Sequence, residues 1–384
     1  MKHTAMSRSS SALLLATSAL ISACATGNSS PADSAVVAAA RSSDSLTRAD
    51  SAGARGNAAL GAPESAVKLG KEQEAVLDAL AALNGKPIET LNPTEARQQP
   101  TPADAVMALL KKEERPITPE AVANVVDRTI PGPGGTLPIR VYTPEGSGSF
   151  PVIVYFHGGG FVIATNDTYD ASARALANAA KAVVVSVEYR KAPEHKFPAA
   201  HDDALAAYRW VISNTASLRG DAARIALAGE SAGGNLAVST AVAAVAAGIK
   251  APIAILAVYP VAGSDTTTAS YQQNATAKPL NRAMMTWFFT HYTRTPADAR
   301  DPRLNLLLAD LKGLPPTTIV TAQVDPLRTD GELLAARLKA AGVSVELRNY
   351  ENVAHEFFGQ GAVVPSARDA VSFAASELRK AFDR

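Results

Sequence analysis

The chain has 384 residues, of which 47% are hydrophobic and 19% charged, a composition typical of a globular protein. Its 37 basic and 36 acidic residues leave a formal net charge of +1, so we expect neither a nucleic-acid partner nor a polybasic membrane patch. A chain of this length has room for one large domain with additions.

Residues 1–23 have the features of an export signal. Lys2 and Arg8 supply positive charge, and the apolar run at 11–21 is too short to span a bilayer. The small residues before Cys24, the only cysteine, resemble the lipobox of bacterial lipoproteins, in which that cysteine is lipidated and begins the mature chain. We therefore expect an exported protein of the cell envelope, tethered to a membrane through Cys24. An ordinary secretory signal with an incidental cysteine is the alternative.

Three further segments follow along the chain. Residues 24–64 are rich in Ala, Ser, Gly and Asp without apolar periodicity, which predicts a flexible linker. Residues 65–125 predict a helical cap, because leucines and valines recur at helical spacing before Asn84 and again after Pro102. Residues 126–384 form the predicted catalytic domain.

The predicted catalytic domain alternates short apolar strands with Ala-rich helical stretches, which predicts an α/β fold with a mostly parallel twisted sheet and helices on both faces. The short Pro- and Gly-containing turn at 143–150 predicts that the first two strands pair antiparallel. The predicted strands lie at 137–142, 152–156, 183–189, 225–228, 253–259, 317–324 and 343–350, and predicted helical stretches include 200–213 and 235–247.

Residues 271–292 hold an unusual density of large apolar side chains, among them Met284, Trp287 and Phe288. We interpret this stretch as a helix. Its apolar residues either pack in the core or form a second cap element that lines an acyl pocket.

The strongest chemical signal is a G-x-S-x-G motif from Gly229 to Gly233, with a predicted strand before it and a predicted helix after it. This context is what a nucleophile elbow requires, because a serine on a strained turn needs small neighbours. The motif predicts Ser231 as a nucleophile whose hydroxyl projects at a helix N-terminus, where the helix dipole favours developing negative charge. A glycine-rich turn without catalysis is the alternative.

A second signal, His157-Gly158-Gly159-Gly160, also follows a predicted strand. Glycines leave backbone N–H groups free to approach an oxyanion, so this loop predicts part of an oxyanion hole, with Ala232 N–H as a further donor. We expect His157 to hold the loop by hydrogen bonds rather than to act as the base, and a plain structural histidine is the alternative.

A serine nucleophile needs a general base. His355 lies just after the last predicted strand, where a loop reaches the catalytic edge of the sheet, whereas His195 and His201 precede the serine and His291 lies in the apolar helical stretch. Chain order therefore favours His355.

The base needs a carboxylate to orient it. Asp325 comes directly after the predicted strand at 317–324, at the edge where loops carry function in open α/β sheets. Asp330, the competitor, is expected in the first turn of the following helix. Preferring Asp325 gives the chain order Ser231, Asp325, His355, which is that of α/β-hydrolases.

Together these motifs resemble the bacterial hormone-sensitive lipase family of α/β-hydrolase esterases, over roughly residues 65–384. The resemblance rests on the motifs already described and on residues 189–195, 197–200 and 325–328. It implies an α/β-hydrolase fold with an N-terminal helical cap over a site for short acyl esters. It also implies a triad of Ser231, Asp325 and His355, with oxyanion donors at Gly159, Gly160 and Ala232.

Glu230 departs from the family pattern, because members usually carry Asp or Thr before the nucleophile. We expect the elbow to tolerate this glutamate, which leaves the subgroup and the substrate preference open. A role for Glu230 as a second acid in catalysis is the alternative.

The expected function is that of a serine carboxylesterase acting on short- to medium-chain acyl esters. No cofactor or metal is expected, since the chain has no H-E-x-x-H motif, cysteine cluster or glycine-rich phosphate loop. An amidase or β-lactam hydrolase on the same triad, and a non-catalytic ligand-binding homologue, remain as alternatives. The oligomeric state is left open.

Overall fold

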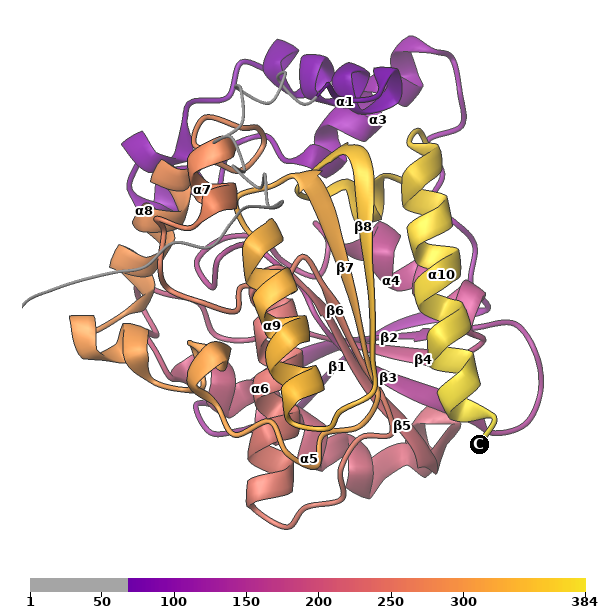
Figure 1. Cartoon of the computed structure of the whole chain (residues 1–384). Helices are drawn as coiled ribbons and strands as arrows, with labels where there is room; N and C mark the ends of the chain where they lie inside the picture. The colour runs from indigo at the N-terminus through magenta and orange to yellow at the C-terminus, as the bar shows by residue number, and fades with distance from the viewer. Residues whose placement is uncertain (1–67) are drawn as a thin grey trace, which may run out of the picture. The chain divides into compact units, whose positions relative to one another are not determined.

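A computed structural model describes residues 68–384. The predicted signal peptide, Cys24 and the predicted linker all lie outside the described residues, so those three predictions stay predictions. The fold below is that of the described part of the chain (Figure 1).

An eight-stranded sheet with the order β1-β2-β4-β3-β5-β6-β7-β8 forms the centre of the fold. From β4 onward every neighbouring pair is parallel, whereas β2 pairs antiparallel with both β1 and β4. The strands are β1 (Asn124–Gly132), β2 (Gly135–Thr143), β3 (Phe150–Phe156), β4 (Val183–Val187), β5 (Gly220–Glu230), β6 (Ile255–Val258), β7 (Thr317–Val324) and β8 (Val345–Ala354). The predicted mostly parallel α/β sheet is thus confirmed.

Helices cover both faces of this sheet. Helices α5, α6 and α9 pack on one face and α4 and α10 on the other, as Figure 1 shows. The α-helices are α1 (Lys71–Ala82), α2 (Pro93–Ala96), α3 (Pro102–Lys112), α4 (Asp170–Ala180), α5 (Ala199–Asn214), α6 (Ala232–Ala246), α7 (Ala269–Gln273), α8 (Arg282–Tyr292), α9 (Arg328–Ala340) and α10 (Pro365–Phe382). Five short 3₁₀ turns complete the set: η1 (Ile88–Thr90), η2 (Thr215–Leu218), η3 (Pro296–Arg300), η4 (Leu306–Leu308) and η5 (Phe357–Gln360). Within residues 68–384, no helix combines the length and the apolar character that crossing a membrane demands.

The predicted antiparallel pairing of β2 with β3 is wrong. Strand β4 lies between them, antiparallel to β2 and parallel to β3. Every residue of β3 is buried, so β3 is a central strand that is covered on both faces. Helix α4 connects it to β4, which lies beside it and runs parallel to it. The connection at 144–149 is therefore a link that passes one strand, not a hairpin turn.

Strand β1 was not among the predicted strands. Only Ile130 is buried in it, so the strand lacks the apolar run that marks its neighbours. It is an edge strand, and Pro131 fits there because an edge position does not require every N–H in the ladder.

The segment predicted as a cap contains α1, α2 and α3, and β1 begins at its end. Helices α1 and α3 lie over the carboxyl ends of β7 and β8 in Figure 1. Thr101 caps α3 by accepting a hydrogen bond from Asp104 N–H, with the Asp104 side chain reaching back to Thr101.

The apolar stretch at 271–292 is not one helix. Helix α7 ends at Gln273 and α8 begins at Arg282, because Pro279 cannot continue a helix and Asn281 caps the new one by accepting from Met284 N–H at 2.8 Å. Trp287 and Phe288 are buried.

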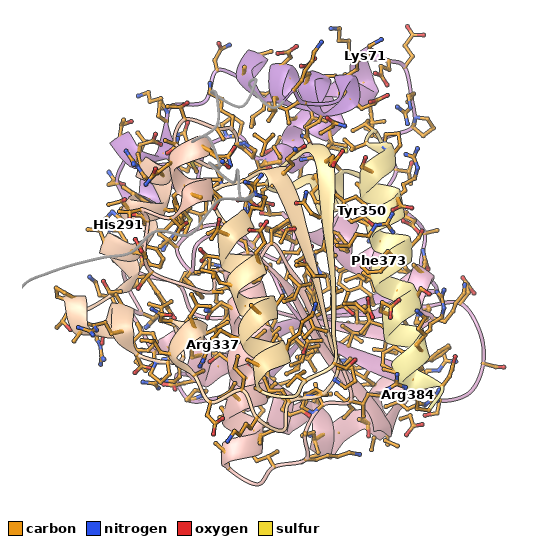
Figure 2. All side chains as sticks on the ribbon, in the orientation of Figure 1. Lys71, His291, Arg337, Tyr350, Phe373 and Arg384 are labelled. Carbon is orange, nitrogen blue, oxygen red and sulfur yellow. The ribbon has the colours of Figure 1, made fainter. Side chains whose placement is uncertain are left out.

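The last strand is fastened to the last helix by an aromatic and ionic cluster, of which Figure 2 labels Tyr350 and Phe373. The Arg348 guanidinium lies over the rings of Tyr350 and Phe373, at 4.8 and 5.1 Å, and pairs with Asp369 of α10. This cluster fixes β8, whose end leads into His355.

Candidate active site

The G-x-S-x-G motif forms a sharp turn between β5 and α6. Ser231 occupies the N-cap of α6 with a φ of 55°, a conformation that residues with a side chain rarely adopt. A Cβ on Gly233 would lie 1.9 Å from the Phe156 carbonyl oxygen, and one on Gly229 would lie 2.1 Å from the Gly233 oxygen. The glycines are therefore required because β3, β5 and α6 approach one another too closely for a side chain.

Ser231, His355 and Asp325 come together at the carboxyl ends of β5, β7 and β8. Ser231 Oγ lies 3.1 Å from His355 Nε2, and His355 Nδ1 lies 2.7 Å from Asp325 Oδ2. The carboxylate can only accept, so Nδ1 carries the hydrogen and Nε2 is free to accept the serine proton. All three side chains are buried. This chain of hydrogen bonds has the connectivity of a nucleophile, a general base and its orienting acid.

Asp325 rather than Asp330 contacts the imidazole. Asp325 Oδ1 is held by Leu327 N–H at 2.8 Å, which leaves Oδ2 for His355. Asp330 lies in the first turn of α9, and its Oδ2 accepts from the N–H groups of Ala262 and Gly263, at 3.0 and 2.8 Å. Asp330 thus fastens the loop after β6 and does not face His355.

Burial and charge act in opposite directions on His355. Burial by itself would lower the pKa of the imidazole, but the Asp325 carboxylate, and after it those of Glu356 and Glu230, raise the pKa above its usual 6.5. The protonated ring is therefore stabilised next to Ser231.

The raised pKa of His355 predicts the acid limb of the pH profile. Protonated His355 cannot accept the Ser231 proton, so kcat/KM for an ester should fall as the pH is lowered through a pKa above 6.5. Initial rates with a neutral ester over a pH series measure this. An acid limb centred below 6.5 would contradict it.

The predicted oxyanion loop lies beside the serine. Gly159 and Gly160 line the same pocket as Ser231 and have φ values of 96° and 58°. No hydrogen bond among the described residues uses the N–H groups of Gly159, Gly160 or Ala232. The three amides predicted from the sequence are therefore free to serve as donors. Helix α8 packs directly on this loop, because a Cβ on Gly160 would lie 2.3 Å from the ring of Phe288.

His157 supports the loop and does not reach Ser231. Its Nδ1 donates to Gly158 O at 2.8 Å, and its ring stacks on Tyr189 at 4.4 Å. The Tyr189 hydroxyl donates in turn to the carbonyl oxygens of His157 and Gly158. Burial lowers the pKa of His157 to about 4, which keeps the ring neutral.

His201 and His291 have structural contacts. His201 is buried, with Nδ1 2.8 Å from the Tyr292 hydroxyl and Nε2 3.0 Å from Asn235 Oδ1. His291, labelled in Figure 2, lies on α8. Its ring packs edge-on against that of Trp287. Within residues 68–384, no hydrogen bond joins Ser231 to a histidine other than His355.

Glu230 is buried below the elbow, and its carboxylate accepts from the hydroxyl groups of Tyr155, at 2.5 Å, and Tyr259. Burial raises the pKa of Glu230 to about 7 against the opposing effect of the two tyrosines. These contacts join β5 to β3 and to the end of β6, and no hydrogen bond leads from Glu230 to Ser231 or His355. The glutamate is therefore accommodated by two tyrosine partners.

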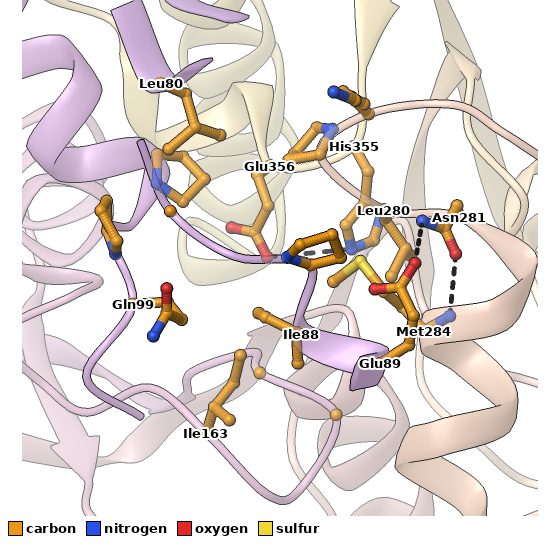
Figure 3. A pocket seen from close by; sticks show the side chains of 18 of the residues that line it. Leu80, Ile88, Glu89, Gln99, Ile163, Leu280, Asn281, Met284, His355 and Glu356 are labelled. Carbon is orange, nitrogen blue, oxygen red and sulfur yellow. Dashed lines mark hydrogen bonds and ion pairs between the residues drawn. The ribbon is translucent and has the colours of Figure 1, made fainter. Parts of the chain in front are cut away.

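A cavity of about 300 Å³ is lined by both Ser231 and His355. Figure 3 shows this pocket from close by, with His355 labelled. Its walls are largely apolar and come from the N-terminal helical segment and from α8. The stretch containing Met284 and Phe288 thus contributes both to the core and to the pocket, which unites the two interpretations of that stretch. The N-terminal helical segment contributes Leu77, Leu80, Ile88 and Pro102 to the wall. The segment at the start of α8 and α8 itself contribute Leu280, Met284 and Phe288.

Sequence patterns missed two side chains near the site. Arg97, after α2, donates to the carbonyl oxygens of Val162 and Ala192 and pairs with Glu194, which ties the N-terminal segment to the oxyanion loop. Glu356 lines the pocket with its Oε1 3.8 Å from His355 Nε2. Only its place next to His355 could have drawn attention to Glu356, and no local signal marks Arg97.

The sequence and the fold are similar to those of known proteins. A family model described as "alpha/beta hydrolase fold" matches residues 153–359. Carboxylesterase NlhH of Mycobacterium tuberculosis is 42% identical over 265 residues, which cover 67% of this chain and 82% of the relative. The ethyl acetate hydrolase of Pseudomonas putida is 32% identical over 77% of this chain and 92% of its own length.

A solved esterase structure from Pyrobaculum calidifontis superimposes with a TM-score of 0.72 at 38% identity, over 79% of this chain and 96% of that one. The family model matches more than half of the chain, and each alignment covers most of the relative's own length. The chain belongs to the α/β-hydrolase family, among its hormone-sensitive-lipase-like esterases. The resemblance inferred from the motifs is thereby confirmed.

Proposed function

We propose that this protein is a carboxylic-ester hydrolase that cleaves short- to medium-chain acyl esters through Ser231, His355 and Asp325. The observation that carries the proposal is the unbroken chain of hydrogen bonds from Ser231 Oγ through the imidazole to Asp325. Relatives named as carboxylesterase and ethyl acetate hydrolase support the same class of reaction.

The reaction proceeds in two acyl-transfer steps. His355 Nε2 takes the proton of Ser231 as Oγ attacks the ester carbonyl carbon, and the tetrahedral intermediate forms. His355 then gives that proton to the leaving alcohol oxygen as the ester C–O bond breaks. Water, deprotonated by the same nitrogen, attacks the acyl-enzyme and releases the carboxylic acid and free Ser231.

The chain's own backbone stabilises the charge that develops on the carbonyl oxygen. The N–H groups of Gly159, Gly160 and Ala232 are unused by other described residues, and Ala232 begins the fifteen-residue helix α6, whose N-terminal dipole adds to the effect. Asp325 keeps Nδ1 protonated, so that Nε2 faces Ser231 as an acceptor.

The size and lining of the pocket favour short and medium acyl chains. A largely apolar cavity of about 300 Å³ lies at the lower end of the range for small-molecule sites. The test is a series of p-nitrophenyl esters graded by acyl length. A maximum of kcat/KM at short or medium chains supports the proposal, and a maximum at long chains in emulsion would point to a lipase instead.

The same series should include an anilide with the best acyl group, because an amidase can use the same three residues. Comparable kcat/KM for the anilide and the ester would replace the proposed esterase activity with an amidase activity. Failure of wild type to react with a fluorophosphonate probe would instead favour a non-catalytic ligand-binding protein.

We also propose that the protein is an envelope lipoprotein anchored through Cys24. The support comes from the sequence alone, in the lipobox-like residues before that cysteine. On phase partitioning of whole-cell extracts with a detergent, wild type should enter the detergent phase, and Cys24→Ala should move to the aqueous phase. Equal partitioning of the two would contradict the anchor.

A further inference from the structure

A second carboxylate faces the catalytic nitrogen of His355. Glu356 follows His355 directly and has a φ of 69°, in the left-handed region that residues with a side chain rarely adopt. The turn brings the glutamate into the pocket that His355 itself lines, as the labelled side chains in Figure 3 show. Apart from Asp325 at Nδ1, no other described carboxylate lies within 4.0 Å of a His355 ring nitrogen.

The Glu356 carboxylate is fixed at one oxygen and open at the other. The Tyr169 hydroxyl donates to Oε1 at 2.5 Å, and Tyr169 itself is buried against the oxyanion loop, where a Cβ on Gly158 would lie 2.2 Å from that hydroxyl. No hydrogen bond among the described residues uses Glu356 Oε2, and the side chain is 21% exposed. A held acceptor thus lines the substrate pocket.

The chemistry of the proposed reaction determines which part of a substrate meets this acceptor. His355 Nε2 must protonate the leaving alcohol oxygen, so that oxygen lies within hydrogen-bond reach of Nε2. Glu356 Oε1 is 3.8 Å from the same nitrogen. Substituents on the first carbons of the alcohol therefore come within several ångströms of the Glu356 carboxylate, whereas the acyl chain leaves the carbonyl carbon on its other side.

We propose that Glu356 is a specificity-determining residue for the alcohol part of the ester, favouring alcohols that carry a positive charge or a hydrogen-bond donor near the ester oxygen. This inference rests on the proposed esterase function and names its substrate class more closely. The ionised Glu356 attracts a cationic alcohol and repels an anionic one, and Oε2 accepts from a neighbouring hydroxyl or amine.

Other charges reach the pocket but are placed differently. Glu89 also lines it, with Oε1 held by Asn281 Nδ2 at 3.1 Å and Oε2 buried without a partner among the described residues, but it does not come within 4.0 Å of a His355 ring nitrogen. Lys86 and Lys278 also line the pocket, and both are exposed. Their positive charges would repel a cationic substrate. Within residues 68–384, neither lysine forms an ion pair with Glu356, so its open oxygen is left uncompensated.

The test compares two butyrate esters of nearly equal shape, butyrylcholine and 3,3-dimethylbutyl butyrate, in which carbon replaces the charged nitrogen. At alkaline pH the wild type should have the higher kcat/KM for the cationic ester. Glu356→Gln should lower the ratio of the two values about tenfold, the order expected for one charge pair in a partly hydrated site. Because both rates come from the same preparation, the ratio is independent of the fraction of folded enzyme.

Glu351→Gln is the matched control, because it removes the same charge from an exposed residue of β8, five positions before Glu356, and should leave the ratio unchanged. An equal ratio in wild type and Glu356→Gln would overturn the inference while leaving the esterase function intact. If wild type hydrolyses neither ester, nor any member of the p-nitrophenyl series, the proposed function itself fails.

Lowering the pH provides an independent readout. The groups that face Glu356 are Tyr169 at the start of α4, His355 beside it, Asp325 after β7, Glu230 at the end of β5 and the buried hydroxyl groups of Tyr155, Tyr189 and Tyr259. Burial raises the pKa of Glu356, against the opposing charge of His355 and the Tyr169 hydroxyl. The ratio should therefore fall in wild type as the carboxyl is protonated and stay flat in Glu356→Gln, and an equal fall in both would contradict the inference.

Discussion

Replacing Ser231 with alanine should lower kcat for a p-nitrophenyl ester by a factor on the order of 10⁶. The variant keeps the oxyanion amides and the pocket but has no oxygen to form the acyl-enzyme. Because Ser231 is buried and its neighbours are packed for a small residue, the alanine should fit without a change of fold. Single-turnover kinetics and circular dichroism of the same preparation measure the two effects separately.

Ser239→Ala is the appropriate control for this experiment. Ser239 lies on α6, the helix that begins after Ser231, and it is equally buried but outside the pocket. Its alanine variant should retain the wild-type kcat. Turnover of Ser231→Ala at the wild-type rate would refute the assignment of the nucleophile.

Replacing Asp325 with asparagine should lower kcat about 10⁴-fold while preserving the fold. Asparagine can still accept from Leu327 N–H, but the amide that replaces Oδ2 is a donor facing His355 Nδ1. The ring hydrogen then moves to Nε2, and His355 can no longer accept the Ser231 proton. The loss should persist at every pH at which wild type is active, because it arises from the tautomer.

Asp330→Asn distinguishes between the two aspartates near the end of β7. Asp330 accepts two backbone N–H groups of the loop after β6, so its variant should affect thermal stability more than kcat. Unfolding curves and kcat of both variants provide the comparison. A greater loss of kcat in Asp330→Asn than in Asp325→Asn would reverse the roles assigned to them.

The chemistry-bearing motifs were predictable because their requirements are local. A turn that places Ser231 at a φ of 55° needs small flanking residues, and a side chain at Gly233 would collide with the Phe156 carbonyl. Such close backbone approach restricts the residue types at fixed spacing, and the sequence therefore displays it as a motif. The predicted buried strands follow the same logic, since a strand covered on both faces needs a continuous apolar run.

The pairing of β2 with β4 and the presence of β1 were not predictable in this way. Hydrogen-bonded neighbours in a sheet are set by how distant segments pack, and β1 is too exposed to carry an apolar pattern. The break before α8 could have been inferred from Pro279 and Asn281, but the apolar side chains on both sides of it masked the boundary.

By itself, the sequence determined the α/β class, and it predicted Ser231 as the nucleophile, the glycine loop beside it and the chain order of the acid and the base. The sequence also favoured Asp325 over Asp330, and the tertiary structure supplied the contact between Asp325 and His355. Only the tertiary structure decided that Glu356 faces the same imidazole from the pocket. The tyrosine that holds Glu356 lies 187 residues earlier in the chain, and the carboxylate that Arg97 binds lies 97 residues later. Backbone conformation is encoded by neighbouring residues, whereas the distances between reacting groups depend on how remote segments pack together.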